Sequence, residues 1–194
     1  MDPAFLAELQ RRHAEPHRRH HGWSRVAGML AMAEEVAHGI ADRPSFILAL
    51  LFHTAVFDRA QAGNARKSAA LMRDLLAATV PEPRLARAEA LIHAFARQEM
   101  PETDDPSLRG DAALLLDMDN APLGAPPAEY DAYEAAIRAE YAHLPDGAWA
   151  DGRAGQIRLL LWRDRIYRTD RFFLAHEKRA RRNLERRLAE LEAG

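Results

Sequence analysis

The chain has 194 residues, a formal net charge of −2 and no cysteine. A chain of this length can bury about two thirds of its unfolded surface, which favours one full-size domain. The absence of cysteine excludes disulfide bridges, thiolate metal sites and cysteine nucleophiles. The near-zero net charge favours neither nucleic acid nor a membrane surface as a partner.

Apolar residues recur at helical spacing along the whole chain, and strand-like alternation is scarce. Pro3 and Pro83 are each suited to the first turn of a helix, and Asn64 is expected to be an N-cap. The expected helices cover residues 2–12, 24–38, 45–57, 64–79, 83–98, 111–118, 127–142, 153–163 and 171–192.

Two connections are expected to be irregular. Residues 100–111 are rich in proline and acidic side chains, and residues 119–127 are rich in turn formers. The chain shows no internal repeat, low-complexity linker or alternation of strands with helices. The sequence therefore predicts one all-α domain over residues 1–194, with about eight or nine helices.

The longest apolar run, residues 46–57, contains His53 and Thr54. It is well short of the roughly 20 apolar residues that a membrane-spanning helix needs. The N-terminal residues also lack the positively charged segment followed by an apolar one that marks a secretory signal. We therefore expect a soluble cytoplasmic protein without a membrane partner.

Several short motifs follow one another between residues 15 and 169. They lie at residues 15–21, 52–54, 64–69, 117–124 and 130–169. In this order they resemble the HD superfamily of metal-dependent phosphohydrolases, which is named after a His-Asp doublet. The resemblance implies a single HD-type helical domain, to which residues 171–192 add a C-terminal helix.

The same resemblance implies where such an enzyme would bind its metal ion. The four ligand positions of the family fall on Arg25, His53, Thr54 and Asp119. Asp117 is a second choice for the last position, and His21 lies at the position of the general acid. Because Arg25 and Thr54 replace two of the four ligands, we expect no metal here. Whether the chain is an enzyme stays open.

These two replacements compensate in charge. Histidine to arginine adds one positive charge and aspartate to threonine removes one negative charge, so the sum equals the charge of a divalent ion. We hypothesise that the Arg25 guanidinium takes the place of the metal and bonds to Asp119 or Asp117.

Three functional interpretations follow. The first, which the sequence favours, is a degenerate phosphohydrolase-like pseudoenzyme or sensor that binds a phosphorylated small molecule or nucleotide. Its ligand-binding residues would be Arg18, His21, Arg25 and His53.

The second interpretation is an active phosphohydrolase with an unusual set of ligands for Mn, Fe, Mg or Zn, or with Arg25 supplying charge instead of a metal. That set would come from His17, His20, His21, His53, Asp117 and Asp119. The third is a scaffold for protein partners.

Simpler explanations exist for the same residues. His53 is also explained as a buried histidine held by one hydrogen bond. Asp117 and Asp119 are also explained as caps at a helix end. The His/Arg-rich segment 11–21 is expected to be a solvated face, and glutamates among the cations of the last helix favour a solvated helix over a nucleic-acid site. The sequence leaves a homo-oligomer open.

Overall fold

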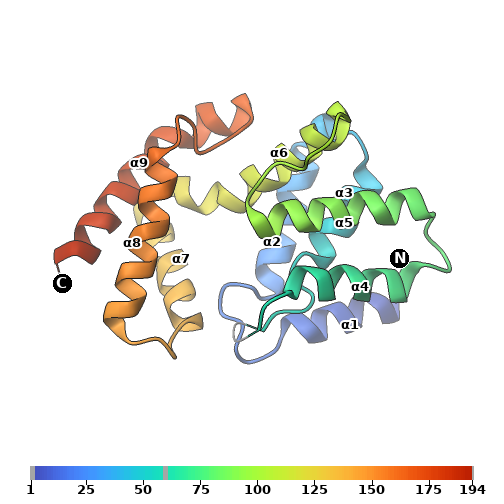
Figure 1. The fold of residues 1–194 in the computed structure, drawn as a ribbon, viewed down its shortest axis with the longest axis horizontal. Helices are drawn as coiled ribbons and strands as arrows, with labels where there is room; N and C mark the ends of the chain where they lie inside the picture. The colour runs from blue at the N-terminus through green and yellow to red at the C-terminus, as the bar shows by residue number, and fades with distance from the viewer. Residues whose placement is uncertain (1–2, 59–60, 194) are drawn as a thin grey trace. The chain divides into compact units, whose positions relative to one another are not determined.

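The computed structural model describes residues 3–58 and 61–193, and within these ranges it contains nine α-helices and no strand (Figure 1). The first six helices are α1 (Pro3–His13), α2 (Trp23–Glu35), α3 (Arg43–Phe52), α4 (Asn64–Leu76), α5 (Glu82–Arg97) and α6 (Pro106–Asn120). The last three are α7 (Pro127–Glu140), α8 (Asp146–Trp162) and α9 (Asp170–Ala193). Two 3-10 turns are η1 (Ala37–Gly39) and η2 (Ala121–Gly124). The prediction of an all-α fold with eight or nine helices is confirmed.

The packing of the chain divides it into two compact units, Met1–Met118 and Asp119–Gly194. We call them the N-terminal unit and the C-terminal unit. Helix α6 contains the division near its C-terminal end. The organisation as one domain, which the sequence favours, stays a prediction. In the described part of the chain, no helix combines the length and apolar character needed to cross a membrane.

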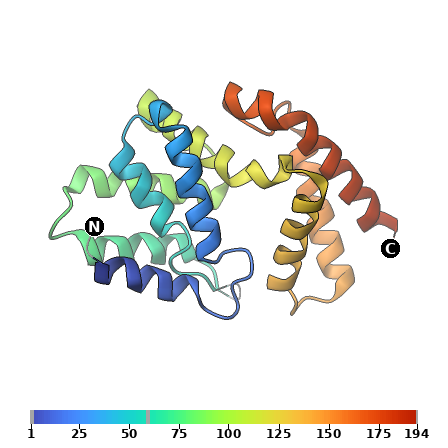
Figure 2. The same ribbon diagram turned by 180° about the vertical axis from the view of Figure 1, so that it is seen from behind.

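Helix α3 forms the centre of the N-terminal unit. It packs against α2, α4 and α5 (Figures 1 and 2), and its Phe52 ring lies 5.6 Å between centroids from the Phe5 ring of α1. Phe46, Leu50 and Phe52 of α3 are fully buried, as are Leu91 and Ile92 of α5. Helix α3 is apolar on nearly every face, and a helix of that kind is stable only when other elements cover it.

The prediction of a helix over residues 45–57 is wrong at its C-terminal end, because α3 ends at Phe52. The chain then turns, and side chains bind the backbone groups that a longer helix would have paired. Arg18 donates to the carbonyl oxygens of Thr54 at 2.6 Å and Ala55 at 3.2 Å. The Ser68 hydroxyl accepts from the backbone N–H of Val56 at 3.0 Å. The apolar run therefore predicted burial correctly, but not helicity.

Other helix ends also differ from the prediction, such as those of α2 and α4, which end at Glu35 and Leu76 rather than at residues 38 and 79. Helix α6 begins at Pro106, inside the expected loop 100–111, because the Asp105 carboxylate caps it by accepting from Ser107 N–H at 2.8 Å. Helix α8 begins at Asp146 rather than near residue 153. Asn64 is not the N-cap of α4: Gly63 is the N-cap, with φ 84°, and the Asn64 amide donates to the Asp58 carbonyl oxygen at 2.7 Å.

A single buried carboxylate connects three elements of the N-terminal unit. Asp111 on α6 is fully buried and accepts from the backbone N–H groups of Ala41 at 2.7 Å and Asp42 at 3.1 Å. It also accepts from the guanidinium of Arg87 on α5 at 2.8 Å. Asp42 in turn caps α3 through Ser45 N–H. The start of α3 is therefore fixed to α5 and α6 by one side chain.

We expect Asp111→Ala to lower the free energy of unfolding by about 3–5 kcal/mol, because it leaves the Arg87 charge and two backbone donors without their buried acceptor. Urea denaturation at pH 7 measures this loss. The matched control is Glu34→Ala, which removes an exposed ion pair with Arg43 and is expected to cost below about 1 kcal/mol. Equal effects of the two substitutions would contradict the role assigned to Asp111.

The C-terminal unit is built on α9. Helix α8 and the turn η2 pack against α9, and α7 packs against η2. The Asn183 amide on α9 donates to the carbonyl oxygens of Leu123 and Ala125, both at 2.9 Å. Gly124 lies so close to α9 that a Cβ atom at this position would be 2.6 Å from the Cβ of His176. Glycine is therefore required in η2 by close approach of the two backbones.

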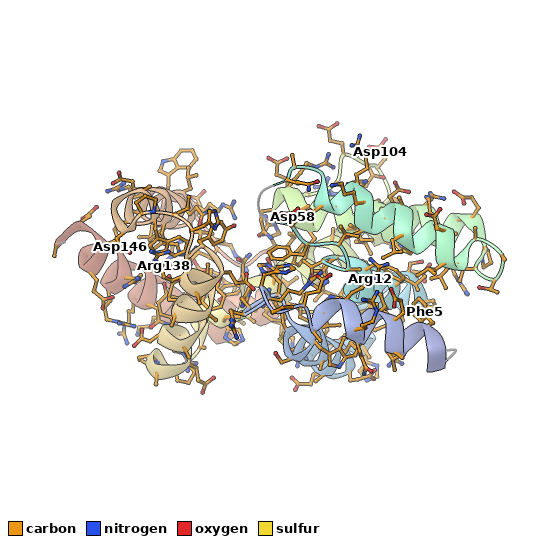
Figure 3. The ribbon with its side chains drawn as sticks, turned by 90° about the horizontal axis from the view of Figure 1, so that it is seen from below. Phe5, Arg12, Asp58, Asp104, Arg138 and Asp146 are labelled. Carbon is orange, nitrogen blue, oxygen red and sulfur yellow. The ribbon has the colours of Figure 1, made fainter. Side chains whose placement is uncertain are left out.

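Polar contacts fix the remaining helices of this unit. The buried Glu134 of α7 accepts from two nitrogens of the Arg153 guanidinium on α8, one of them at 3.1 Å. Arg138 and Asp146 form an ion pair at 2.6 Å near the turn between the same two helices, where Figure 3 shows them side by side. These contacts hold α7 and α8 together at two points.

We expect Gly124→Ala to destabilise the chain by about 1–3 kcal/mol, because the added methyl group meets the backbone and Cβ of α9 rather than a flexible side-chain end. Gly152→Ala in α8 is the matched control, since a Cβ there meets nothing within 4 Å. That change is expected to stabilise by about 0.5–1 kcal/mol, because alanine favours the helix. Thermal unfolding of both variants checks the opposite signs.

Candidate functional site

Four of the predicted site residues lie in the N-terminal unit, on two neighbouring segments. Arg18 and His21 precede α2, and Arg25 lies in its first turn. His53 lies at the C-cap of α3 and is only 3% exposed. Arg25 and His21 are half-buried. Because α2 packs against α3, the fold brings these residues into one region.

The His53 ring has one satisfied nitrogen and one that lacks a partner. Its Nδ1 lies 2.7 Å from the carbonyl oxygen of Leu50, so Nδ1 must carry the proton and donate it. Its Nε2 is buried and has no hydrogen-bond partner. The ring of Phe95 lies 4.4 Å away between centroids. Since buried polar atoms are almost always bonded, this Nε2 is a candidate contact for a ligand.

The surroundings of His53 keep its ring neutral. Burial first, and the positive charge of Arg25 second, lower the pKa of His53 well below its ordinary value of 6.5. The Leu50 carbonyl opposes this, while His21 and His13 lower the pKa further. At neutral pH the Nε2 atom is therefore an acceptor.

His13 is a second buried histidine, so the prediction of a solvated face for residues 11–21 is wrong at this position. It is 2% exposed, its Nδ1 lies 2.9 Å from the Leu9 carbonyl oxygen, and its Nε2 has no hydrogen-bond partner. Burial lowers the pKa of His13 as well, and the ring of Trp23 lies edge-on at 5.8 Å. The spacing Leu9 to His13, one helical turn on the buried face of α1, could have indicated this burial.

Arg18 was also predicted to bind the ligand, but its side chain is fully buried and engaged by the protein. Besides the two carbonyl oxygens after α3, it donates to the Glu15 carboxylate at 3.0 Å. It therefore fixes residues 15–21 against the turn that follows His53. Its role as a direct ligand contact stays a prediction.

The histidine-rich segment lies over the same turn. His17 Nε2 is 2.9 Å from the Phe57 carbonyl oxygen, and the His21 ring stacks on the Phe57 ring at 4.2 Å. His20 lies edge-on to His21 at 4.8 Å. Among the described residues, however, no three His, Asp or Glu side chains are placed to hold one metal ion. The rearranged ligand set stays a prediction.

Asp117 and Asp119 both lie in the last turn of α6. Asp117 is fully buried and Asp119 is half-buried. A carboxylate near the C-terminal end of a helix is disfavoured by the helix dipole. The explanation of the two residues as caps stays a prediction. Asp119 belongs to the C-terminal unit, and the bond between Arg25 and Asp119 or Asp117 stays a prediction.

Three cations of α9 bind other groups of the chain. Arg181 donates to the carbonyl oxygen of Arg163 at 2.7 Å, and Arg186 pairs with Glu190 at 2.9 Å. Arg187 also pairs with Glu190, at 3.0 Å. These contacts agree with the interpretation of residues 171–192 as a solvated helix with internal ion pairs.

Comparison of the chain with models of known protein families, with curated proteins and with solved structures gives no match. The resemblance to HD phosphohydrolases therefore rests on the short motifs, and the chemistry of the site rests on its own geometry.

We expect the protein to lose stability as the pH falls below 6.5. The unfolded chain then binds protons that the folded His53 cannot accept, so each such histidine contributes a slope of up to about 1.4 kcal/mol per pH unit. Urea denaturation at pH 7.5 and 5 measures the difference. In His53→Gln this difference is expected to shrink by up to about 2 kcal/mol.

The control for this experiment is Phe46→Leu, which changes a fully buried apolar side chain of the same helix. It is expected to lower stability at both pH values by the same amount, because no titrating group is removed. An unchanged pH dependence in His53→Gln would contradict a neutral, buried His53.

Proposed function

We propose that this chain is a degenerate HD-type phosphohydrolase-like protein that binds a phosphate-bearing small molecule or nucleotide and does not hydrolyse it with a metal ion. The observation that carries the proposal is the buried, unpartnered Nε2 of His53 under the influence of the Arg25 charge.

Arg25 supplies a positive charge and hydrogen-bond donors, both of which favour binding of an oxyanion. A guanidinium is always charged, carries five donors, and matches the geometry of phosphate oxygens better than an ammonium group does. Its half-buried position on α2 strengthens the attraction, because nearby charges are screened less there than in bulk water. His21, at the general-acid position of the resemblance, stacks on Phe57 beside the same segment.

The same residue opposes a metal ion. A fixed positive charge at position 25 repels a divalent cation, and Thr54 offers no carboxylate. The described residues also provide no group of three ligands for a metal. These points support a binding protein over the alternative of an active metal-dependent hydrolase.

Binding of inorganic phosphate to the full chain, measured by isothermal titration calorimetry, tests the proposal. We expect Arg25→Gln to weaken binding by about 10- to 100-fold, because a hydrogen bond from a charged donor is lost. The control is Arg43→Gln on α3, whose side chain is exposed and pairs with Glu34. It is expected to leave the affinity unchanged.

Two results would count against this function. One is equal affinity for phosphate in the wild type and Arg25→Gln. The other is a stoichiometric amount of Mn, Fe, Mg or Zn in protein purified without a His-tag, together with release of phosphate from a nucleotide. That second result would favour the active hydrolase.

A further inference from the structure

His53 presents one hydrogen-bonding atom to any ligand, and that atom can only accept. The Leu50 carbonyl oxygen at 2.7 Å fixes the proton on Nδ1, so the lone pair of the neutral ring lies on Nε2. Nε2 is buried and receives no hydrogen bond from the protein. A ligand that satisfies it must bring a donor.

Arg25 requires the opposite kind of ligand atom, a hydrogen-bond acceptor. Its guanidinium has donors only, and its Nε is buried in the same unit. With five N–H groups it can bind a ligand in addition to its neighbours in the protein. A ligand that contacts both residues therefore needs an anionic oxygen for Arg25 and an O–H group for His53.

We propose that His53 selects oxyanions that carry a proton, so that the site binds inorganic phosphate and singly charged phosphate monoesters and rejects sulfate. This inference rests on the proposed phosphate-binding function. At neutral pH inorganic phosphate carries at least one O–H group, whereas sulfate has the same shape and only acceptor oxygens. Sulfate would place an oxygen lone pair against the lone pair of Nε2, and neither atom would be satisfied.

The expected discrimination is large for two ions of equal shape. A site built to bond a hydroxyl group rejects an analogue without it, because the buried partner atom is left unpaired. For one such bond we expect phosphate to bind about 10- to 100-fold more tightly than sulfate. Phosphate monoesters lose their last proton at a pKa of about 6, so their binding should weaken above this pH while that of inorganic phosphate persists.

The test is calorimetric titration of the full chain with sodium phosphate and with sodium sulfate at pH 7.5 and equal ionic strength. The informative variant is His53→Gln, because an amide can rotate to donate as well as accept. We expect the ratio of its affinities for phosphate and sulfate to fall close to one. Circular dichroism verifies that the variant is folded. If it is not folded, methyl phosphate titrated into the wild type at pH 5.5 and 7.5 replaces it.

The outcomes separate this inference from the function on which it rests. Preference for phosphate that disappears in His53→Gln, or binding of methyl phosphate that weakens at least 10-fold at pH 7.5, supports both. Equal binding of phosphate and sulfate overturns the inference and leaves the phosphate-binding function standing. A preference that persists unchanged in folded His53→Gln also overturns it. If neither phosphate nor sulfate binds, the function and the inference are both overturned.

Discussion

The buried guanidinium of Arg18 is the interaction on which the candidate site depends. Removing a charged group from water is costly, and here four acceptors offset that cost: the Glu15 carboxylate and the carbonyl oxygens of His21, Thr54 and Ala55. The side chain also lies over the Phe57 ring at 5.4 Å. Since these acceptors belong to two separate segments, one side chain joins the histidine-rich residues to the turn after α3.

That junction determines what His53 can do. If α3 continued, His53 would be one more residue on an apolar face of the helix, and neighbouring turns would cover it. At the C-cap its ring instead bonds the carbonyl oxygen three residues earlier, one of the groups that a helix end leaves without a backbone partner. The other nitrogen then has no partner in the protein. The chemistry of the site is thus a consequence of how α3 ends.

Sequence patterns predicted the helices well where local chemistry decides them. Helix α9 lies within two residues of the expected range, and α5 begins where Pro83 indicated. One of the errors occurs where distant side chains decide. The end of α3 depends on Arg18 and Ser68. The early start of α8 includes Gly147 and Gly152, which local propensity disfavours in a helix.

The candidate site shows the same division. His53 and Arg25 could be proposed from the order of motifs, because each lies in a recognisable stretch of sequence. The close contact of the Phe95 ring with His53 could not, since it depends on how α5 approaches α3. The contacts of the Arg18 side chain could not be predicted either. A sequence shows that an arginine is present, but not that backbone oxygens rather than a ligand occupy it.

The choice of backbone oxygens has an evolutionary consequence. Arg18 binds the carbonyl groups of Thr54 and Ala55, and every amino acid carries a carbonyl group. Mutation at position 54 can therefore change the side chain without breaking the bonds that shape the turn. The turn could in this way persist while the chemistry beside His53 changed.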